Sequence, residues 1–264
     1  MLMRSTISPP LASSGNILLC GLSPSDRSLL EPHLEQVQVK RGAELIRAGQ
    51  PLSDVYFPDA GLFSLEEQPS PCRDPIEVAI IGREGLLGWP ALLGCGHSNH
   101  RVTARGRRAL VQRIAVADLR DACATSATLS DALLRFVHFV IVQMGRTITS
   151  HADDDLDRRV ARWLLMRHDR LGGDELSVCH DEVAASLGVR RASITDKLHI
   201  LEGELFVRCH RGRVLIRNRD GLEAFAGPAY GNPEAHYRHM IAPFGKNKRS
   251  DLITTSAREL GAVV

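Results

Sequence analysis

The chain has 264 residues, of which 44% are hydrophobic and 24% charged, and its formal net charge is +2. This length allows two modest hydrophobic cores, and the composition is that of a globular protein rather than a disordered or fibrous one. The six cysteines form no CxxC pair and show no regular spacing, which argues against a disulfide framework or a structural zinc site. We therefore expect a protein of the reducing cytoplasm.

The sequence also argues against a membrane protein and against an enzyme. The longest apolar run, residues 136–144, contains His138 and Gln143 and is much shorter than the roughly 20 apolar residues that cross a bilayer. No phosphate-binding loop, HExxH motif or recognisable Ser/His/Asp grouping is present. We expect no membrane partner and no catalytic site.

The first half of the chain is predicted to be a β-roll. Residues 1–16 are rich in Ser and Pro and are predicted to be a flexible N-terminus. Across residues 17–128, short β-prone runs alternate with Gly and Pro, which is typical of a small roll or barrel. These runs are residues 37–39, 44–46, 55–57, 62–65, 76–81, 102–104 and 110–114.

A long helix is predicted next, over residues 129–152. Its apolar residues recur at spacings of three and four and so form one stripe. The stripe consists of Leu133, Phe136, Val137, Val140, Met144 and Ile148. Such a stripe either packs on the roll of its own chain or forms the interface of a two-stranded homodimer.

The segment from residue 153 to 226 is predicted to be a winged helix-turn-helix domain. Asp153, Asp154 and Asp155 interrupt the apolar stripe, and acids suit the start of the next helix, residues 156–170. Residues 180–201 then show helical spacing on both sides of Gly188, where the chain must turn. This pattern predicts a DNA-binding domain, and because such domains usually bind operators in pairs, it favours the dimer interpretation of the long helix.

The second helix of this motif carries the side chains expected to contact double-stranded DNA. We expect Arg191 to bind a base directly, because the planar guanidinium can bond guanine O6 and N7 together. Other residues are expected to tune that contact or to neutralise phosphate. These residues are Arg190, Ser193, Thr195, Asp196, Lys197, Arg211 and Arg213.

Positive charge is concentrated in this part of the chain. Residues 206–216 read as two β-rich runs around a glycine-containing turn, which predicts the wing. Between residues 190 and 219 there are eight Lys or Arg against three acids, although the whole chain is nearly neutral. Such local charge is typical of a phosphate-contacting surface. Residues 227–264 show no sustained periodicity and are predicted to be a flexible tail.

Three segments, in this order, resemble the Crp/Fnr family of bacterial transcription regulators. RGAELIRAGQPLSDVYFPDAGLFSL (41–65) looks like the first half of the family's cyclic-nucleotide-binding-type roll. GREGLLGWPALLG (82–94) is similar to its ligand cassette, and DEVAASLGVRRASITDKLHILEGE (181–204) resembles its DNA-reading segment. The resemblance implies an α+β chain with a cyclic-nucleotide-binding-like β-roll, a long dimerisation helix and a C-terminal winged helix-turn-helix. It also implies RNA polymerase as a partner.

The chain departs from this family at the candidate effector pocket, which we place at Gly88, Trp89, Arg101 and Val102. Family members that bind cyclic nucleotides have a Glu after the cassette glycine and a Ser or Thr after the phosphate-binding Arg. Here Trp89-Pro90 and Val102 stand at those positions, which removes an acceptor for the ribose and a hydroxyl for the phosphate. We therefore do not expect cAMP to bind.

Other cofactors of the family are not expected either. Its iron-sulfur branch has a tight N-terminal cysteine cluster, whereas this chain has only Cys20 in that region. Cys95, His97 and His100 lie within six residues but lack a fourth ligand for a metal or haem. The effector is left unassigned. The alternative to a DNA-binding regulator is a nucleotide-responsive module, or an enzyme with its site in the roll.

Overall fold

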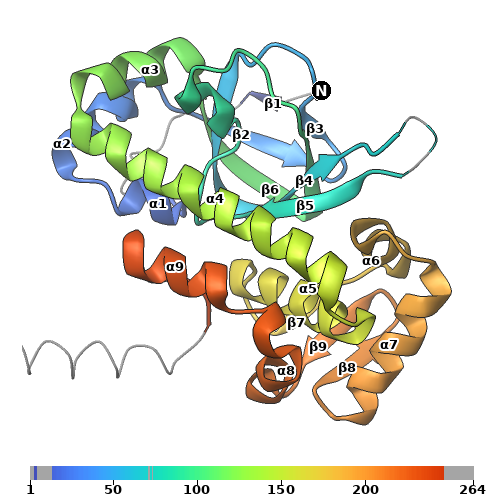
Figure 1. The fold of residues 1–264 in the computed structure, drawn as a ribbon. Coiled ribbons are helices and arrows are strands. Elements are labelled where there is room, and N and C mark those ends of the chain that lie inside the picture. Colours follow the sequence, from blue (N-terminus) through green and yellow to red (C-terminus); the bar gives the residue numbers. More distant parts are fainter. Residues whose placement is uncertain (1–2, 5–13, 71, 73, 247–264) are drawn as a thin grey trace, which may run out of the picture.

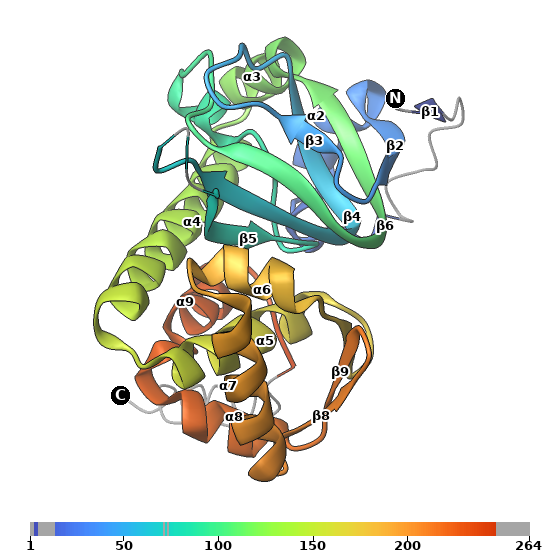
Figure 2. The ribbon, with the colours of Figure 1, turned by 90° about the vertical axis from the view of Figure 1, so that its right-hand side faces the viewer.

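The computed structural model describes residues 3–4, 14–70, 72 and 74–246. In Figure 1 a β-roll lies above a smaller helical domain, and one long helix runs diagonally from the first to the second. Figure 2, turned by 90°, shows the helical domain directly beneath the sheet of the roll. The predicted order of roll, long helix and C-terminal helical domain is confirmed.

The roll is built on a curled antiparallel sheet with the strand order β1-β2-β6-β4-β5, in which β3 also pairs with β6. β4 and β6 each join two of the predicted runs, because the pairing continues through register shifts near Ala60 and Leu62 instead of ending there. The strands are β1 (Met3–Arg4), β2 (Glu35–Lys40), β3 (Glu44–Ile46), β4 (Asp54–Glu67), β5 (Ile76–Ile81) and β6 (Arg101–Ala115).

Short helices close the ends of the roll. Ser126, the N-cap residue of the long helix α4 (Ala127–Asp153), links this helix to the first turn of α2 (Pro24–Leu30). Its Oγ donates to Asp26 Oδ1 over 2.5 Å and accepts a hydrogen bond from the backbone N–H of Leu129. The others are α1 (Ile17–Cys20), η2 (Glu31–His33), η3 (Trp89–Leu93) and α3 (Val116–Thr125).

Most of the predicted dimer stripe on α4 is buried within its own chain. Leu133, Phe136, Val137 and Val140 are at most 3% exposed, and three of them belong to the core of the roll. The prediction that these four residues contact a partner subunit was therefore wrong. The physical reason is that the roll presents an apolar face of its own, which α4 covers.

A different apolar stripe on α4 faces solvent. Leu134, Ile141 and Ile148 are 39%, 53% and 71% exposed and recur every seven residues. By length and composition α4 could also cross a membrane, but the core helix of a soluble protein passes the same test. Its buried face packs on the roll, which accounts for its hydropathy.

The helical domain has its own core, formed by α5 (Leu156–Arg170) and the elements that follow it. A three-stranded sheet with the order β7-β9-β8 covers one side. The elements are β7 (Glu175–Ser177), α6 (His180–Leu187), α7 (Arg191–Gly203), β8 (Val207–His210), β9 (Arg213–Ile216) and α8 (Arg219–Ala226).

Buried ion pairs join the two domains through α5. Arg170 Nε donates to Glu84 Oε1 over 2.7 Å, and both side chains are 0% exposed. Arg167 Nη2 donates to Glu77 on β5, also over 2.7 Å. Burial alone would lower the pKa of Arg170, but the nearby carboxylates, Glu84 first among them, raise it above the ordinary arginine value. The guanidinium therefore stays charged at the joint.

The prediction of a flexible tail over residues 227–264 was wrong as far as residue 246. Within it, η4 (Gly227–Ala229) and α9 (Asn232–Met240) are ordered, and α9 packs along α4. Tyr237 is fully buried against Phe139, a partner far away in the sequence, which explains why local periodicity did not reveal it. Residues 247–264 lie outside the described part of the chain.

The predicted flexible N-terminus also needs correction. Met3–Arg4 pairs with β2 as β1, and Ser14 donates to Asp59 over 2.6 Å. Asn16 is buried and donates to the carbonyls of Pro58 and Gly85. Residues 1–2 and 5–13, which also belong to that prediction, lie outside the described residues.

The fold predicts a strict requirement for glycine in the cassette segment. A Cβ at Gly85 would lie 1.9 Å from Cε2 of Phe136 on α4. We expect Gly85→Ala to lower the free energy of unfolding by about 1–3 kcal/mol or more, because helix and loop must separate. Chemical denaturation measures this. Gly96→Ala is the control, since a Cβ there would meet nothing within 4 Å, and an equal loss in both variants would contradict the packing argument.

Candidate nucleic-acid interface

The predicted helix-turn-helix is present as α6 and α7. Gly188 ends α6 with φ +64°, a left-handed conformation that favours glycine, and its N–H caps the carbonyls of Ala184 and Ala185. Ile194, Leu198 and Leu201 hold α7 in the domain core, which leaves its opposite side to solvent. The start of α7 is therefore accessible to a ligand.

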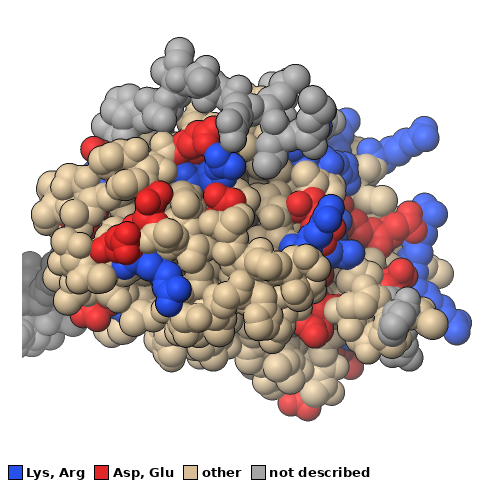
Figure 3. All heavy atoms as spheres, turned by 90° about the horizontal axis from the view of Figure 1, so that it is seen from above, with Lys and Arg blue, Asp and Glu red and all other residues tan. Residues whose placement is uncertain are grey.

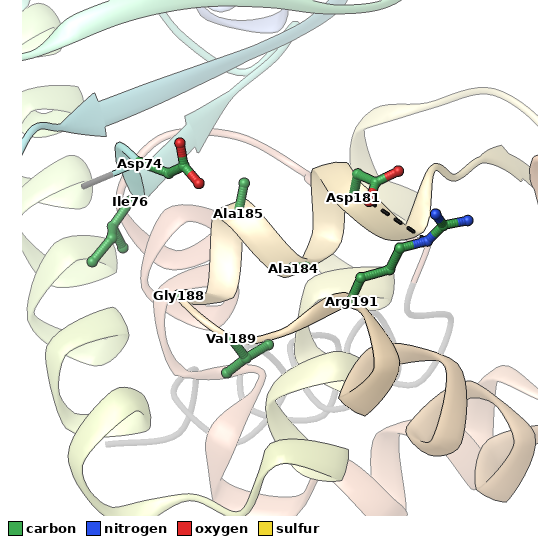
Figure 4. Close-up of a pocket in the computed structure, with 8 residues that line it drawn as sticks. All are labelled: Asp74, Ile76, Asp181, Ala184, Ala185, Gly188, Val189 and Arg191. Carbon is green, nitrogen blue, oxygen red and sulfur yellow. Dashed lines mark ion pairs between the residues drawn. The ribbon is translucent and has the colours of Figure 1, made fainter. Parts of the chain in front are cut away.

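Two arginines lie at that start. Arg190 is the N-cap residue of α7, and Arg191 is its first helical residue; both side chains are exposed, as is Asp196 one turn later. Arg191 Nε lies 3.5 Å from Asp181 Oδ1 of α6, and Figure 4 shows the two side chains pointing toward each other. An ion pair this exposed contributes little to stability, so Arg191 is available to an incoming base.

Other predicted DNA contacts are engaged inside the domain. The hydroxyl of Thr195 hydrogen-bonds Nδ1 of His180 over 2.9 Å, which ties α7 to the first turn of α6. Lys197 Nζ lies 3.9 Å from Asp157 of α5 and is half-buried. Ser193 is half-buried beside them. The structure thus gives Thr195 and Lys197 roles in holding the motif together.

The predicted wing is the β8–β9 hairpin. Gly212 makes its turn with φ +74°, and Arg211 beside it is exposed. Arg213 is also exposed but donates to Glu175 of β7 over 3.1 Å. Because Arg213 is paired with Glu175, Arg211 is the better of the two candidates for a phosphate contact.

A hollow of about 470 Å³ lies between the helix-turn-helix and the roll. Asp74 and Ile76 of the roll line one side, and Asp181 and Arg191 line the other (Figure 4). Beside it, Arg41 of the roll donates to Glu182 of α6 over 3.1 Å. The first helix of the motif is thus docked on the sheet above it.

On the side of the roll turned away from the helical domain, the described residues carry charges of both signs. In Figure 3, which shows the molecule from above, Lys and Arg alternate with Asp and Glu among many uncharged residues. This view agrees with the sequence, in which the excess of basic residues falls between residues 190 and 219.

Of the four residues of the candidate effector pocket, Gly88 and Val102 lie close to the same residue, Ile46, whereas Arg101 points away from them. Gly88 begins η3 near Ile46, and Val102 is buried opposite Ile46 in the core. Arg101 is next to Val102 on β6 and so points to the other face, since successive strand residues alternate. Trp89 is half-buried against the core.

On the outer face Arg101 belongs to a polar network centred on Glu66. Arg101 donates to Glu66 over 2.6 Å, and Arg105 donates to the other oxygen of the same carboxylate. Glu66 is nearly fully buried by these partners. From Arg105 the network continues through Ser64 to Glu77, the partner of α5, so it forms part of the joint between the domains.

No metal site is formed among the described residues, where no group of three or more His, Cys, Asp or Glu is arranged to hold an ion. His100, which the sequence placed near two other potential ligands, instead pairs with Glu67 over 2.9 Å.

Comparison with known proteins assigns the helical domain. Residues 158–225 match the model of the Crp-like helix-turn-helix domain. They form a Crp-like helix-turn-helix domain. No curated protein matches the chain in sequence.

The complete fold is similar to solved Crp/Fnr structures. FixK2 from Bradyrhizobium japonicum superposes with a TM-score of 0.65 at 15% identity, covering 75% of this chain and 99% of that one. A putative Crp/Fnr regulator from Eubacterium rectale gives 0.62 at 19% identity, covering 80% and 98%. A Crp-family regulator from Thermus thermophilus gives 0.61 at 20%, covering 74% and 98%. The chain thus has the fold of the Crp/Fnr structures, and its residues 158–225 match the Crp-like helix-turn-helix domain.

Sequence reasoning missed two features of this chain. Asp181 and Glu182 were not recognised as the partners of arginines on α7 and the roll, and nothing in the local pattern indicates such long-range pairs. The exposed stripe on α4 was predicted only at Ile148, and Leu134 and Ile141 were missed for a different reason. Its seven-residue spacing was visible in the sequence but was overlapped by the stronger stripe that packs on the roll.

The His180–Thr195 hydrogen bond predicts that Thr195 is structural. Thr195→Val keeps the side-chain shape but removes the hydroxyl, and we expect a loss of about 0.5–1.5 kcal/mol in the free energy of unfolding. Denaturant titration measures it. The control is Ser193→Ala, because the described residues offer the Ser193 hydroxyl no partner, so stability should stay equal or rise slightly. Equal losses of unfolding free energy in the two variants would contradict a structural role for Thr195.

Proposed function

We propose that the chain is a homodimeric, sequence-specific transcription regulator that binds a two-fold symmetric operator. The observation that carries the proposal is the pair of exposed arginines at the start of α7, held there by the buried face of a Crp-like helix-turn-helix. In that position a side chain can reach base edges in the major groove. The excess of basic residues between 190 and 219 supplies the phosphate contacts.

The dimer follows from the exposed stripe on α4. Leu134, Ile141 and Ile148 lie on one side of the helix at heptad spacing, as in a two-stranded coiled coil. Gly145 is exposed between the last two and leaves room for close approach of a second helix. Two copies related by a two-fold axis would place their α7 helices in successive major grooves, about 34 Å apart.

The base-reading role of Arg191 can be tested with two variants. Arg191→Ala is expected to cost about 1–3 kcal/mol at the selected operator and to relax the preference at one base pair, because a bidentate guanine contact is lost. Arg211→Ala, in the wing, is expected to weaken binding to all sequences alike and to reduce the salt dependence. Selection from a random DNA pool followed by titration distinguishes the two patterns, and the same sequence-independent loss in both would contradict base reading by Arg191.

The dimer interface is tested by a charge in the exposed stripe. Ile141→Asp is expected to give monomers and to weaken operator binding, because the carboxylate would be buried against its symmetry mate. Light scattering measures the mass. Leu93→Asp is the matched control, since Leu93 is similarly exposed, at 52%, but lies on the roll. A dimer that survives Ile141→Asp would place the interface elsewhere.

A further inference from the structure

The C-terminal segment, residues 227–246, leaves the DNA-binding domain and returns to the roll. After α8 the chain passes through η4, and α9 then runs beside α4, as Figures 1 and 2 both show. This segment lies beyond the Crp-like domain, which ends at residue 225. It contacts both units, because Tyr237 and Phe244 belong to the core of the roll and Tyr230 packs against the core of the DNA-binding domain.

Near both of its ends, at Tyr230 and at Lys246, the segment is anchored to the DNA-binding domain. The hydroxyl of Tyr230 donates to Asp169 of α5, and Arg219 of α8 donates both to Asp169, over 2.6 Å, and to the Tyr230 oxygen, over 2.8 Å. Lys246 donates to the carbonyl of Gly173. These contacts surround the end of α5, the same helix that carries the ion pairs to the roll.

Between these two ends the segment is anchored to the roll and to α4. Tyr237 donates its hydroxyl to the carbonyl of Glu84 over 2.6 Å. Its ring packs on Phe139 of α4 and on Phe244, with centroid distances of 5.0 Å to each. A fully buried aromatic trio of this kind holds the segment firmly.

Between the two anchors a carboxylate is buried at the joint. Glu234 is 1% exposed, and neither carboxylate oxygen has a hydrogen-bond partner among the described residues. Burial and Asp169 raise its pKa, while Arg170 and Arg162 oppose that rise. A buried carboxylate is tolerated only where positive charge compensates it, so its position depends on the docked arrangement of α5.

We propose that residues 227–246 form an intramolecular strap that fixes the DNA-binding domain in one orientation against the roll. The strap spans the joint and is secured on both sides, so the domain cannot rotate without extracting the buried aromatic rings. If the chain binds DNA as proposed above, the strap also fixes the distance between the two recognition helices. The dimer would then tolerate only one half-site spacing.

The test uses full-length chains with the strap released. Tyr237→Ala combined with Phe244→Ala removes the roll-side anchor and alters no residue before the strap. We expect a larger radius of gyration in X-ray scattering and two calorimetric transitions in place of one, because the domains become independent. The control is His239→Ala with Met240→Ala, two exposed residues of α9, which should leave both measurements unchanged.

If the Tyr237→Ala/Phe244→Ala variant does not fold, a milder variant tests the same proposal. Tyr230→Phe with Tyr237→Phe removes only the two hydroxyls, and the ratio of calorimetric to van't Hoff enthalpy should rise above that of the parent chain. If the folded variants keep the radius of gyration of the parent chain and unfold in a single calorimetric transition, the proposed strap is contradicted. Both measurements are made without DNA, so they test the strap even if the proposed function fails.

The DNA arm of the experiment compares the operator with a copy lengthened by two base pairs between its half-sites. In the strap-released variant, the dimer should prefer the original operator over the lengthened one less strongly than the parent chain does. The reason is that freely oriented DNA-binding domains can reach the half-sites of both operators. If the domains separate but the preference for spacing stays as in the parent chain, the strap does not set the spacing, and that part of the proposal is overturned.

Discussion

The arrangement of this protein depends on one buried ion pair, Arg170 with Glu84. Neither side chain is exposed, and the pair joins the last turn of α5 to the cassette loop of the roll. Removing two charges from water costs several kcal/mol per ion, and only close, hydrogen-bonded geometry offsets that cost. The pair has such geometry, because Gly82 donates to the second oxygen of Glu84 and Arg170 donates to the carbonyl of Met166. Displacing α5 would leave two buried charges without partners, so the joint is well defined.

The other contacts between the domains follow from this position of α5. Arg167 reaches Glu77 on β5, and its guanidinium stacks 3.4 Å above the ring of Trp163. The α6 helix is brought under the sheet, where Glu182 meets the arginines of the roll. The start of α7 remains open to solvent, as a DNA-binding surface requires. These polar contacts, together with α4 and residues 227–246, connect the roll to the helices that we propose bind DNA.

Elements that depend on local residue patterns were predicted correctly from the sequence. Features that depend on contacts between residues far apart in the chain were not predicted. The helix-turn-helix was found from the spacing around Gly188, and the strands of the roll were found from short β-prone runs, although two pairs of runs proved to be single bulged strands. The apolar stripe of α4 was correctly identified, but its partner was not, because periodicity shows which face is buried and not what covers it. The tail looked irregular because the partner of Tyr237 lies on α4. The candidate DNA contacts lie on α7 and in the β8–β9 hairpin, and only their neighbours show that the Thr195 hydroxyl bonds His180 and that Lys197 lies near Asp157.

The central claim, that the buried pair sets the joint, is tested most directly by a double-mutant cycle. Arg170→Met, Glu84→Met and the double variant are compared with the parent chain by denaturant unfolding. Each single variant should lose about 3–5 kcal/mol, because it leaves one charge buried and unpaired, whereas the double variant should lose much less than the sum. A coupling free energy of about 2 kcal/mol or more between the two positions is the predicted result. Losses that simply add, with no coupling, would contradict the account.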